Sequence, residues 1–179
     1  MASVLIPLAQ GCEELEAVTI IDLLRRASID VVSAGLDEKA VIASRGVVLL
    51  PDTDLDSALT REYDMVVLPG GLPGADHLNN DQRIRDLLMK MASKGKYTAA
   101  ICAAPMVLHS TGLLENKMAT AYPGVLDALG VVSQDTAIVE DDKVITSRGP
   151  GTAMDFALTL IEKLAGKSKR DEVEKGLAR

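Results

Sequence analysis

A short apolar run ends in a cysteine at Thr98-Ala99-Ala100-Ile101-Cys102-Ala103-Ala104-Pro105, and a helical pattern begins directly after it. The small residues after Cys102 permit a tight turn from a strand into a helix, and proline is favoured in the first turn of a helix. The thiol of Cys102 is then expected at the amino end of that helix, where the helix dipole and free N–H groups stabilise a thiolate. This geometry resembles a nucleophile elbow, although the glycines of the G-x-S-x-G motif are absent. The competing interpretation is a buried cysteine that packs as a small hydrophobic residue.

The composition indicates one globular domain and argues against several classes of protein. A chain of 179 residues can bury a sizeable core, and its net charge of −7 disfavours a nucleic-acid-binding surface. No apolar stretch reaches the roughly 18 residues of a membrane span, and Met1-Ala2 leads into a strand-like run without the positive segment of a signal peptide. Cys12 and Cys102 are too few for a disulfide framework or a zinc site. We therefore expect a cytoplasmic protein without a metal site.

Strand-like apolar runs alternate with amphipathic helical patterns up to about residue 114. This alternation predicts a mostly parallel sheet that is covered by helices on both faces. The expected strands are Ser3–Leu8, Asp30–Ala34, Asp64–Leu68 and the run before Cys102, with a hairpin or bent strand at Ala40–Leu50. The expected helices are Glu13–Ala27, Asp54–Leu59, Asp81–Ala92 and the segment from Pro105 to Gly112.

The pattern changes after Leu114 to short β segments. These are expected at Met118–Ala121, Thr136–Val139 and Lys143–Thr146, the last two joined as a hairpin. Thr152 is a natural N-cap for a final long helix. We assign residues 1–166 to a single domain and residues 167–179 to a charged C-terminal tail or surface helix.

Three loops are expected to meet at one edge of the sheet, because ligands of parallel sheets bind beyond the carboxyl ends of the strands. These loops are Ala9–Glu13, Pro69–Gly74 and Cys102–Pro105. The N–H groups of Gly70, Gly71 and Ala103 are candidates to stabilise a developing oxyanion. For Gly70-Gly71, an ordinary turn is the simpler interpretation.

The first expected helix begins with Glu13, Glu14 and Glu16, and these three residues cannot share one face. Acidic residues in a first turn usually interact with the helix dipole at the surface. At least one of the three is nevertheless expected to point toward the crevice. A carboxyl beside a thiolate stays protonated, because two negative charges in a dry pocket are costly, and it can then act as a general acid or base.

Two alternative chemistries use other residues. A peptidase-type cysteine–histidine pair needs His77 or His109, but His109 lies two helical turns, roughly 10 Å, beyond Cys102. His77 follows the glycine loop and is not excluded by spacing. Cys12 is either a resolving thiol for an oxidised Cys102 or a small buried side chain.

Four separated motifs, in the same order, resemble the ThiJ/PfpI family, specifically its parkinsonism-associated protein deglycase subgroup within the class I glutamine amidotransferase-like superfamily. The motifs are Gly11-Cys12-Glu13-Glu14-Leu15-Glu16, Asp64-Met65-Val66-Val67-Leu68-Pro69-Gly70-Gly71, Ala100-Ile101-Cys102-Ala103-Ala104-Pro105, and Ile145-Thr146-Ser147-Arg148-Gly149-Pro150-Gly151-Thr152 running into Asp155-Phe156-Ala157-Leu158. The similarity extends over nearly the whole chain.

The resemblance implies a flavodoxin-like three-layer α/β sandwich that forms a homodimer and uses no cofactor. It also implies that Cys102 is the nucleophile and that Glu16 is its protonated hydrogen-bonding partner. The backbone amides of Gly71 and Ala103 would line an oxyanion pocket.

Three further positions follow from the same resemblance. Arg26 and Arg45 correspond to arginines near the dimer interface. Relatives often have a histidine where this chain has Tyr122, and a phenol can donate a hydrogen bond to a substrate oxygen but is a poor base at neutral pH. Arg148 is interpreted as a structural residue.

The resemblance implies a cofactor-free, glutathione-independent glyoxalase or deglycase that acts on methylglyoxal, glyoxal or their early adducts on proteins and nucleotides. One alternative is a redox-sensing chaperone whose Cys102 is oxidised to a sulfinate, and a weaker one is a cysteine peptidase. The expected partners are a small reactive aldehyde, or a glycated protein or nucleotide, and a second copy of the chain. No membrane and no sequence-specific nucleic-acid partner are expected.

Overall fold

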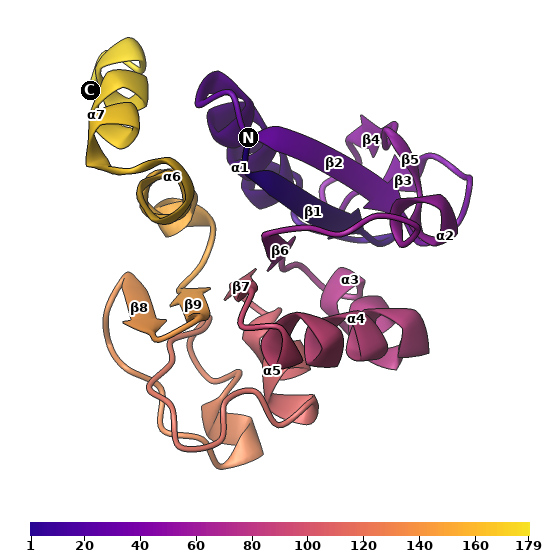
Figure 1. Cartoon of the computed structure of the whole chain (residues 1–179). Helices are drawn as coiled ribbons and strands as arrows, with labels where there is room; N and C mark the ends of the chain where they lie inside the picture. The colour runs from indigo at the N-terminus through magenta and orange to yellow at the C-terminus, as the bar shows by residue number, and fades with distance from the viewer.

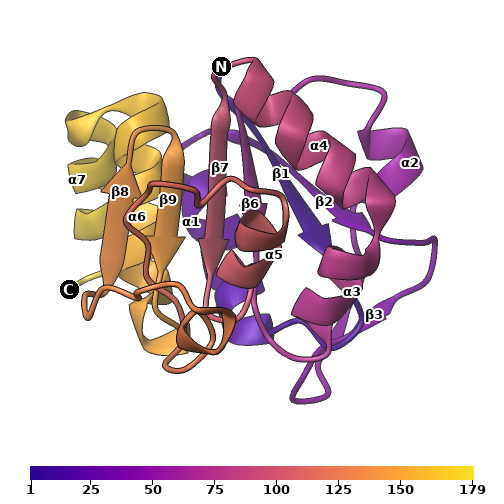
Figure 2. The same cartoon turned by 90° about the horizontal axis from the view of Figure 1, so that it is seen from below.

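A seven-stranded sheet forms the centre of the computed structural model, which describes residues 1–179. In spatial order its strands are β5 (Thr53–Asp54), β2 (Asp30–Gly35), β1 (Ser3–Leu8), β6 (Met65–Leu68), β7 (Tyr97–Ile101), β9 (Val144–Ser147) and β8 (Ile138–Asp141). All neighbours pair in parallel except β8 and β9. In Figure 2 the arrows of β1, β7 and β9 accordingly point downward, whereas β8 points upward.

Helices cover both faces of this sheet, as the alternating sequence pattern predicts. On one face lie α1 (Glu14–Arg26), α6 (Ala153–Ala165) and α7 (Lys167–Gly176), and on the other lie α2 (Leu55–Ala58), α3 (Gly74–Asn80), α4 (Gln82–Ser93) and α5 (Pro105–Ser110) (Figure 1). The central strand order β2-β1-β6-β7-β9 is the flavodoxin-like order. The expected three-layer α/β sandwich is therefore confirmed.

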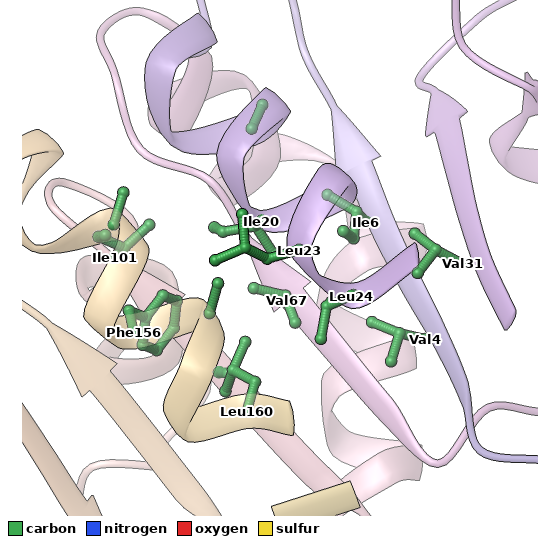
Figure 3. Packing of buried hydrophobic residues seen from close by; sticks show 14 of the residues in the cluster. Val4, Ile6, Ile20, Leu23, Leu24, Val31, Val67, Ile101, Phe156 and Leu160 are labelled. Carbon is green, nitrogen blue, oxygen red and sulfur yellow. The ribbon is translucent and has the colours of Figure 1, made fainter. Parts of the chain in front are cut away.

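Each face of the sheet has its own hydrophobic core. Successive side chains of a strand point to opposite faces, so Val4 and Ile6 of β1 belong to one buried cluster and Leu5 to the other. In the first cluster, Phe156 of α6 packs close to Ile20 of α1 above the sheet (Figure 3). The two cores are thus mainly aliphatic, with Phe156 in the first cluster and Tyr63 in the second.

A small hairpin lies apart from the main sheet. It consists of β3 (Val41–Ile42) and β4 (Val48–Leu49), which pair antiparallel, and it confirms the hairpin expected at Ala40–Leu50. Val41 is buried in the core, whereas Ile42 is 58% exposed and Val48 is 64% exposed. The hairpin therefore presents an apolar surface that this chain does not cover by itself.

The strand expected at Met118–Ala121 does not form, which corrects the sequence interpretation. Only an isolated bridge joins Ala119 to Ser133. The N–H of Thr120 donates instead to the side-chain oxygen of Thr146, at 2.9 Å. This segment is held by buried hydroxyl groups rather than by a backbone ladder.

Two further differences concern the helices. Thr152 directly precedes α6, but its hydroxyl does not cap that helix and bonds within the preceding turn to Gly149 O, at 2.9 Å. The helix α3 was not expected, because it begins at a glycine and ends in two asparagines, which are weak helix formers.

Residues 167–176 form α7, which packs on α6 and buries Val173. None of the helices is both long enough and apolar enough to span a bilayer.

Candidate functional site

Cys102 lies in the turn between β7 and α5, and its backbone has a positive φ of 64°. This left-handed conformation is uncommon for a residue with a side chain and is stabilised here by two backbone hydrogen bonds. Cys102 N donates to Ser147 O at 3.0 Å, and Cys102 O accepts from Tyr122 N at 2.8 Å. The expected elbow-like cysteine is present, and the residue is buried, with 8% of its surface exposed.

Gly70 lies against the cysteine turn, where no side chain fits. A Cβ on Gly70 would lie 2.6 Å from the Cβ of Cys102 and 2.7 Å from Ile101 O. Its N–H donates to Glu16 Oε2 at 2.8 Å. The Gly70 N–H therefore already has a partner inside the protein, and its role as an oxyanion donor stays a prediction.

Glu16 points from α1 into the protein and is fully buried. Its second carboxyl oxygen, Oε1, has no hydrogen-bond partner, while the carboxyl lies close enough to Cys102 for each group to shift the pKa of the other. Burial raises the pKa of the Glu16 carboxyl to about 7, against the opposing effect of the Gly70 N–H. Of the three glutamates at the start of α1, Glu16 is the one that faces the cysteine.

Two kinds of interaction shift the pKa of the Cys102 thiol in opposite directions. Burial and the charge of an ionised Glu16 raise the pKa of this thiol to about 12, whereas the N–H groups of Gly71 and Ala103 lower it. The repulsion disappears when Glu16 carries a proton. The pair is therefore suited to hold one negative charge rather than two, and a thiolate formed at Cys102 would face two N–H donors.

The remaining residues expected from the sequence are Tyr122, Arg26 and Arg45, and they lie outside the pair of Glu16 and Cys102. The ring of Tyr122 is half exposed and lies against Gly149, where a Cβ would be 3.3 Å from the ring. Arg26 pairs with Asp22 at 2.8 Å on the surface of α1. Arg45 lies in the turn between β3 and β4, so neither arginine contacts the sulfur.

The histidines and Cys12 do not join the site. The groups that act on the Cys102 thiol are Glu16, Gly71 and Ala103, and neither His77 nor His109 is among them. His77 lines a separate cavity of about 310 Å³. Cys12 is a buried free thiol, and burial followed by the charge of Glu14 raises its pKa to about 12. The chain contains no group of three or more side chains arranged to hold a metal ion.

Two residues of the site region have roles that the sequence did not indicate. The carbonyl of Ser147 holds the cysteine turn, and its hydroxyl lies 2.7 Å from that of Thr152. Glu14 is buried at the start of α1 and bonds to the β3–β4 hairpin. Only the motif at Ile145–Thr152, quoted for the family resemblance, marked the neighbourhood of Ser147.

A flavodoxin-like sheet with a buried cysteine beside a buried carboxyl places the chain among α/β proteins that carry a thiol at the carboxyl edge of the sheet. Residues 2–163 match the DJ-1/PfpI family. The chain belongs to this family and, within it, to the DJ-1 subgroup. The resemblance inferred from the four motifs is confirmed.

Individual relatives share almost the full length of the chain. Protein dj-1beta of Drosophila melanogaster is 46% identical over 98% of this chain and 96% of its own length. Its crystal structure superposes with a TM-score of 0.95, covering 99% of this chain and 97% of that one. The structure of oxidized Toxoplasma gondii DJ-1 also gives a TM-score of 0.95, at 37% identity, covering 99% and 98% of the two chains. Glutathione-independent glyoxalase DJR-1.2 of Caenorhabditis elegans is 34% identical over 98% of this chain and 95% of its own length.

Proposed function

We propose that this protein is a glutathione-independent glyoxalase that converts small 2-oxoaldehydes such as methylglyoxal into hydroxy acids. The observation that carries the proposal is the buried Glu16 carboxyl, which has a free oxygen beside the Cys102 thiol. A relative that is 34% identical bears the name of this activity. The 8% exposure of Cys102 favours a free aldehyde over an adduct on a protein surface.

In the proposed reaction, the Cys102 thiolate attacks the aldehyde carbon and forms a hemithioacetal. The N–H groups of Gly71 and Ala103 stabilise the negative charge that develops on the former carbonyl oxygen. This oxygen then takes the proton of the Glu16 carboxyl and leaves Glu16 as a carboxylate. Glu16 removes the proton from the first carbon and returns a proton to the second, so the first carbon is oxidised and the second is reduced. Water then cleaves the lactoyl thioester, releases lactate and restores the thiol.

Two additions to the proposal concern a role for Tyr122 and the removal of aldehyde adducts (deglycation). The half-exposed Tyr122 ring lies beside the cysteine turn and is suited to donate a hydrogen bond to a substrate oxygen. Removal of early aldehyde adducts from proteins or nucleotides would follow the same chemistry, either directly or by depletion of free aldehyde.

The proposal is tested by measuring lactate formation from methylglyoxal without glutathione. We expect turnover in the wild type and a loss of at least about 100-fold in both Cys102→Ser and Glu16→Gln, because each removes a group that takes part in bond making. His109→Gln is the matched control and should keep wild-type turnover. Equal lactate in wild type and buffer would refute the proposal.

A redox sensor is the second candidate, supported by the oxidized Toxoplasma gondii DJ-1 structure. The intact mass of the protein after treatment with mild peroxide distinguishes a redox sensor from a glyoxalase. A gain of two oxygens on Cys102 in a protein without lactate-forming activity would favour the sensor.

A homodimer is also proposed. The hairpin exposes Ile42, Val47 and Val48, and the neighbouring α1 exposes Leu15 and Val18. Apolar side chains gathered on one surface typically mark an interface. Arg26 and Arg45 lie on the same two elements and are placed to contribute polar contacts at its rim.

A further inference from the structure

The β3–β4 hairpin depends on other parts of the chain for its position. Each of its strands has two residues, and they pair only with each other. So short a hairpin is not stable by itself in water. Its position is therefore set by its contacts with the rest of the chain. Val41 and Ala43 are buried in the core, and hydrogen bonds connect the hairpin to the loop before α1 and to the first turn of that helix.

The carboxylate of Glu14 makes the central connection. Glu14 is 9% exposed and accepts hydrogen bonds from Arg45 N at 2.9 Å, from Ser44 Oγ at 3.0 Å and from Val47 N at 3.4 Å. Burial opposes its ionisation, but the N–H at the start of the helix, the Ser44 hydroxyl and the hairpin N–H groups together lower its pKa. A buried carboxylate with this many donors is an ionised group in a defined position.

The preceding loop makes the second connection. The side-chain amide of Gln10 accepts from Ile42 N and donates to Ala40 O, both at 2.9 Å. Backbone bonds of 2.8 Å join Gly11 N to Ile42 O and Ser44 N to Cys12 O. Loop and hairpin therefore form one hydrogen-bonded unit.

The same loop is bonded on its other side to the candidate site. Glu13 N donates to Gly70 O, and Gly70 N donates to Glu16 Oε2, both at 2.8 Å. Because Glu16 Oε1 has no hydrogen bond of its own, the first turn of α1 and the Gly70 N–H decide where this oxygen lies relative to the sulfur. A shift of that helical turn would move the reacting carboxyl directly.

We infer that Glu14 is a positioning residue, which fastens the hairpin to the start of α1 and thereby holds Glu16 at its place beside Cys102. The inference deepens the proposed function, on which its catalytic part rests. It also connects the exposed apolar face of the hairpin to the site, since anything that moves the hairpin acts on the same hydrogen bonds.

The test compares Glu14→Gln with Glu13→Gln. The two variants remove the same charge at adjacent positions, but the Glu13 carboxylate accepts a hydrogen bond only from Ser44 Oγ, at 2.8 Å, and from no N–H of the hairpin. The rate of Cys102 alkylation by iodoacetamide is measured from pH 5 to 10 by peptide mass, together with kcat and KM for methylglyoxal. Displacements of about 1 Å can reduce rates by as much as about 100-fold.

We expect Glu14→Gln to lower kcat by about tenfold with KM little changed, and to shift the rise of the alkylation rate to lower pH, because a displaced Glu16 raises the pKa of the Cys102 thiol less. Glu13→Gln should stay within about twofold of wild type. Identical alkylation profiles for the two variants would overturn the inference.

Two further outcomes of the experiment can be distinguished from each other. If Glu14→Gln does not fold, Gln10→Ala tests the same connection from the exposed side of the loop, and an unchanged alkylation profile there also overturns the inference. If the wild type forms no lactate, the proposed function fails, while the alkylation profiles still decide the role of Glu14.

Discussion

Glu16 couples the stability of the fold to pH. Its pKa is raised from 4.5 to about 7, mainly by burial, so the folded state binds a proton more tightly than the unfolded chain does. This contribution to stability is complete below about pH 4.5 and is lost as the pH rises through about 7. The difference amounts to about 3 kcal/mol, because one pKa unit corresponds to about 1.4 kcal/mol.

We therefore predict that Glu16→Gln removes this pH dependence. The difference in unfolding free energy between variant and wild type should move in favour of the variant by about 3 kcal/mol between pH 4.5 and pH 8. Urea denaturation at several pH values measures it. Parallel pH curves for the two proteins would contradict the assigned protonation of Glu16.

Gly70 provides a steric prediction. Gly70→Ala places a Cβ 2.6 Å from the Cβ of Cys102, and a backbone shift must relieve the contact. We expect a loss of about 1–3 kcal/mol in unfolding free energy, as for overpacked cores, with slower alkylation of Cys102. Gly176→Ala is the control, because nothing lies within 4 Å of the Cβ it would add. Equal stability of the two variants would count against tight packing at the cysteine turn.

At the level of single elements, removal of α7 tests the proposal that the domain ends at residue 166. Helix α7 buries Val173 in the same cluster as Phe156, yet lies on the opposite side of α6 from the cysteine turn (Figure 1). We predict that a chain ending at Gly166 folds with a lower Tm and an unchanged pH profile of Cys102 alkylation. Val173→Ala should lower the unfolding free energy by about 1–2 kcal/mol. Failure of the shortened chain to fold would make α7 an integral part of the domain.

For the whole molecule, the exposed apolar surface of α1 and the hairpin leads to a prediction about assembly. Val48→Glu places a charge in the proposed interface, and we expect it to turn a dimer into a monomer in sedimentation velocity, because an unpaired charge is costly to bury. Val132→Glu is the matched control, since Val132 is 79% exposed on a distant loop. A monomeric wild type, or two variants that sediment alike, would refute the proposed dimer.

Much of the fold could be predicted, because hydrophobic periodicity is a local property. The run Ser3–Leu8 became β1 without a change of boundary, and the pattern at Glu13–Ala27 became α1 within one residue at each end. The strand expected at Met118–Ala121 failed, because Thr120 bonds to a side chain 26 residues away. Motif and charge pointed to Cys102 and Glu16, which the structure brings together, but they did not indicate that the Gly70 N–H faces Glu16.

By itself, then, the sequence determined the alternating α/β architecture, the cysteine in a strand–helix turn and the need for a protonated carboxyl close to it, since each follows from residue type and short spacing. The tertiary structure alone decided which N–H groups remain free and which carboxylate holds the hairpin. Gly70 meets Glu16 across 54 residues, and Glu14 meets Arg45 across 31. Such hydrogen bonds depend on how separate elements pack together, and no local pattern of residues records that packing.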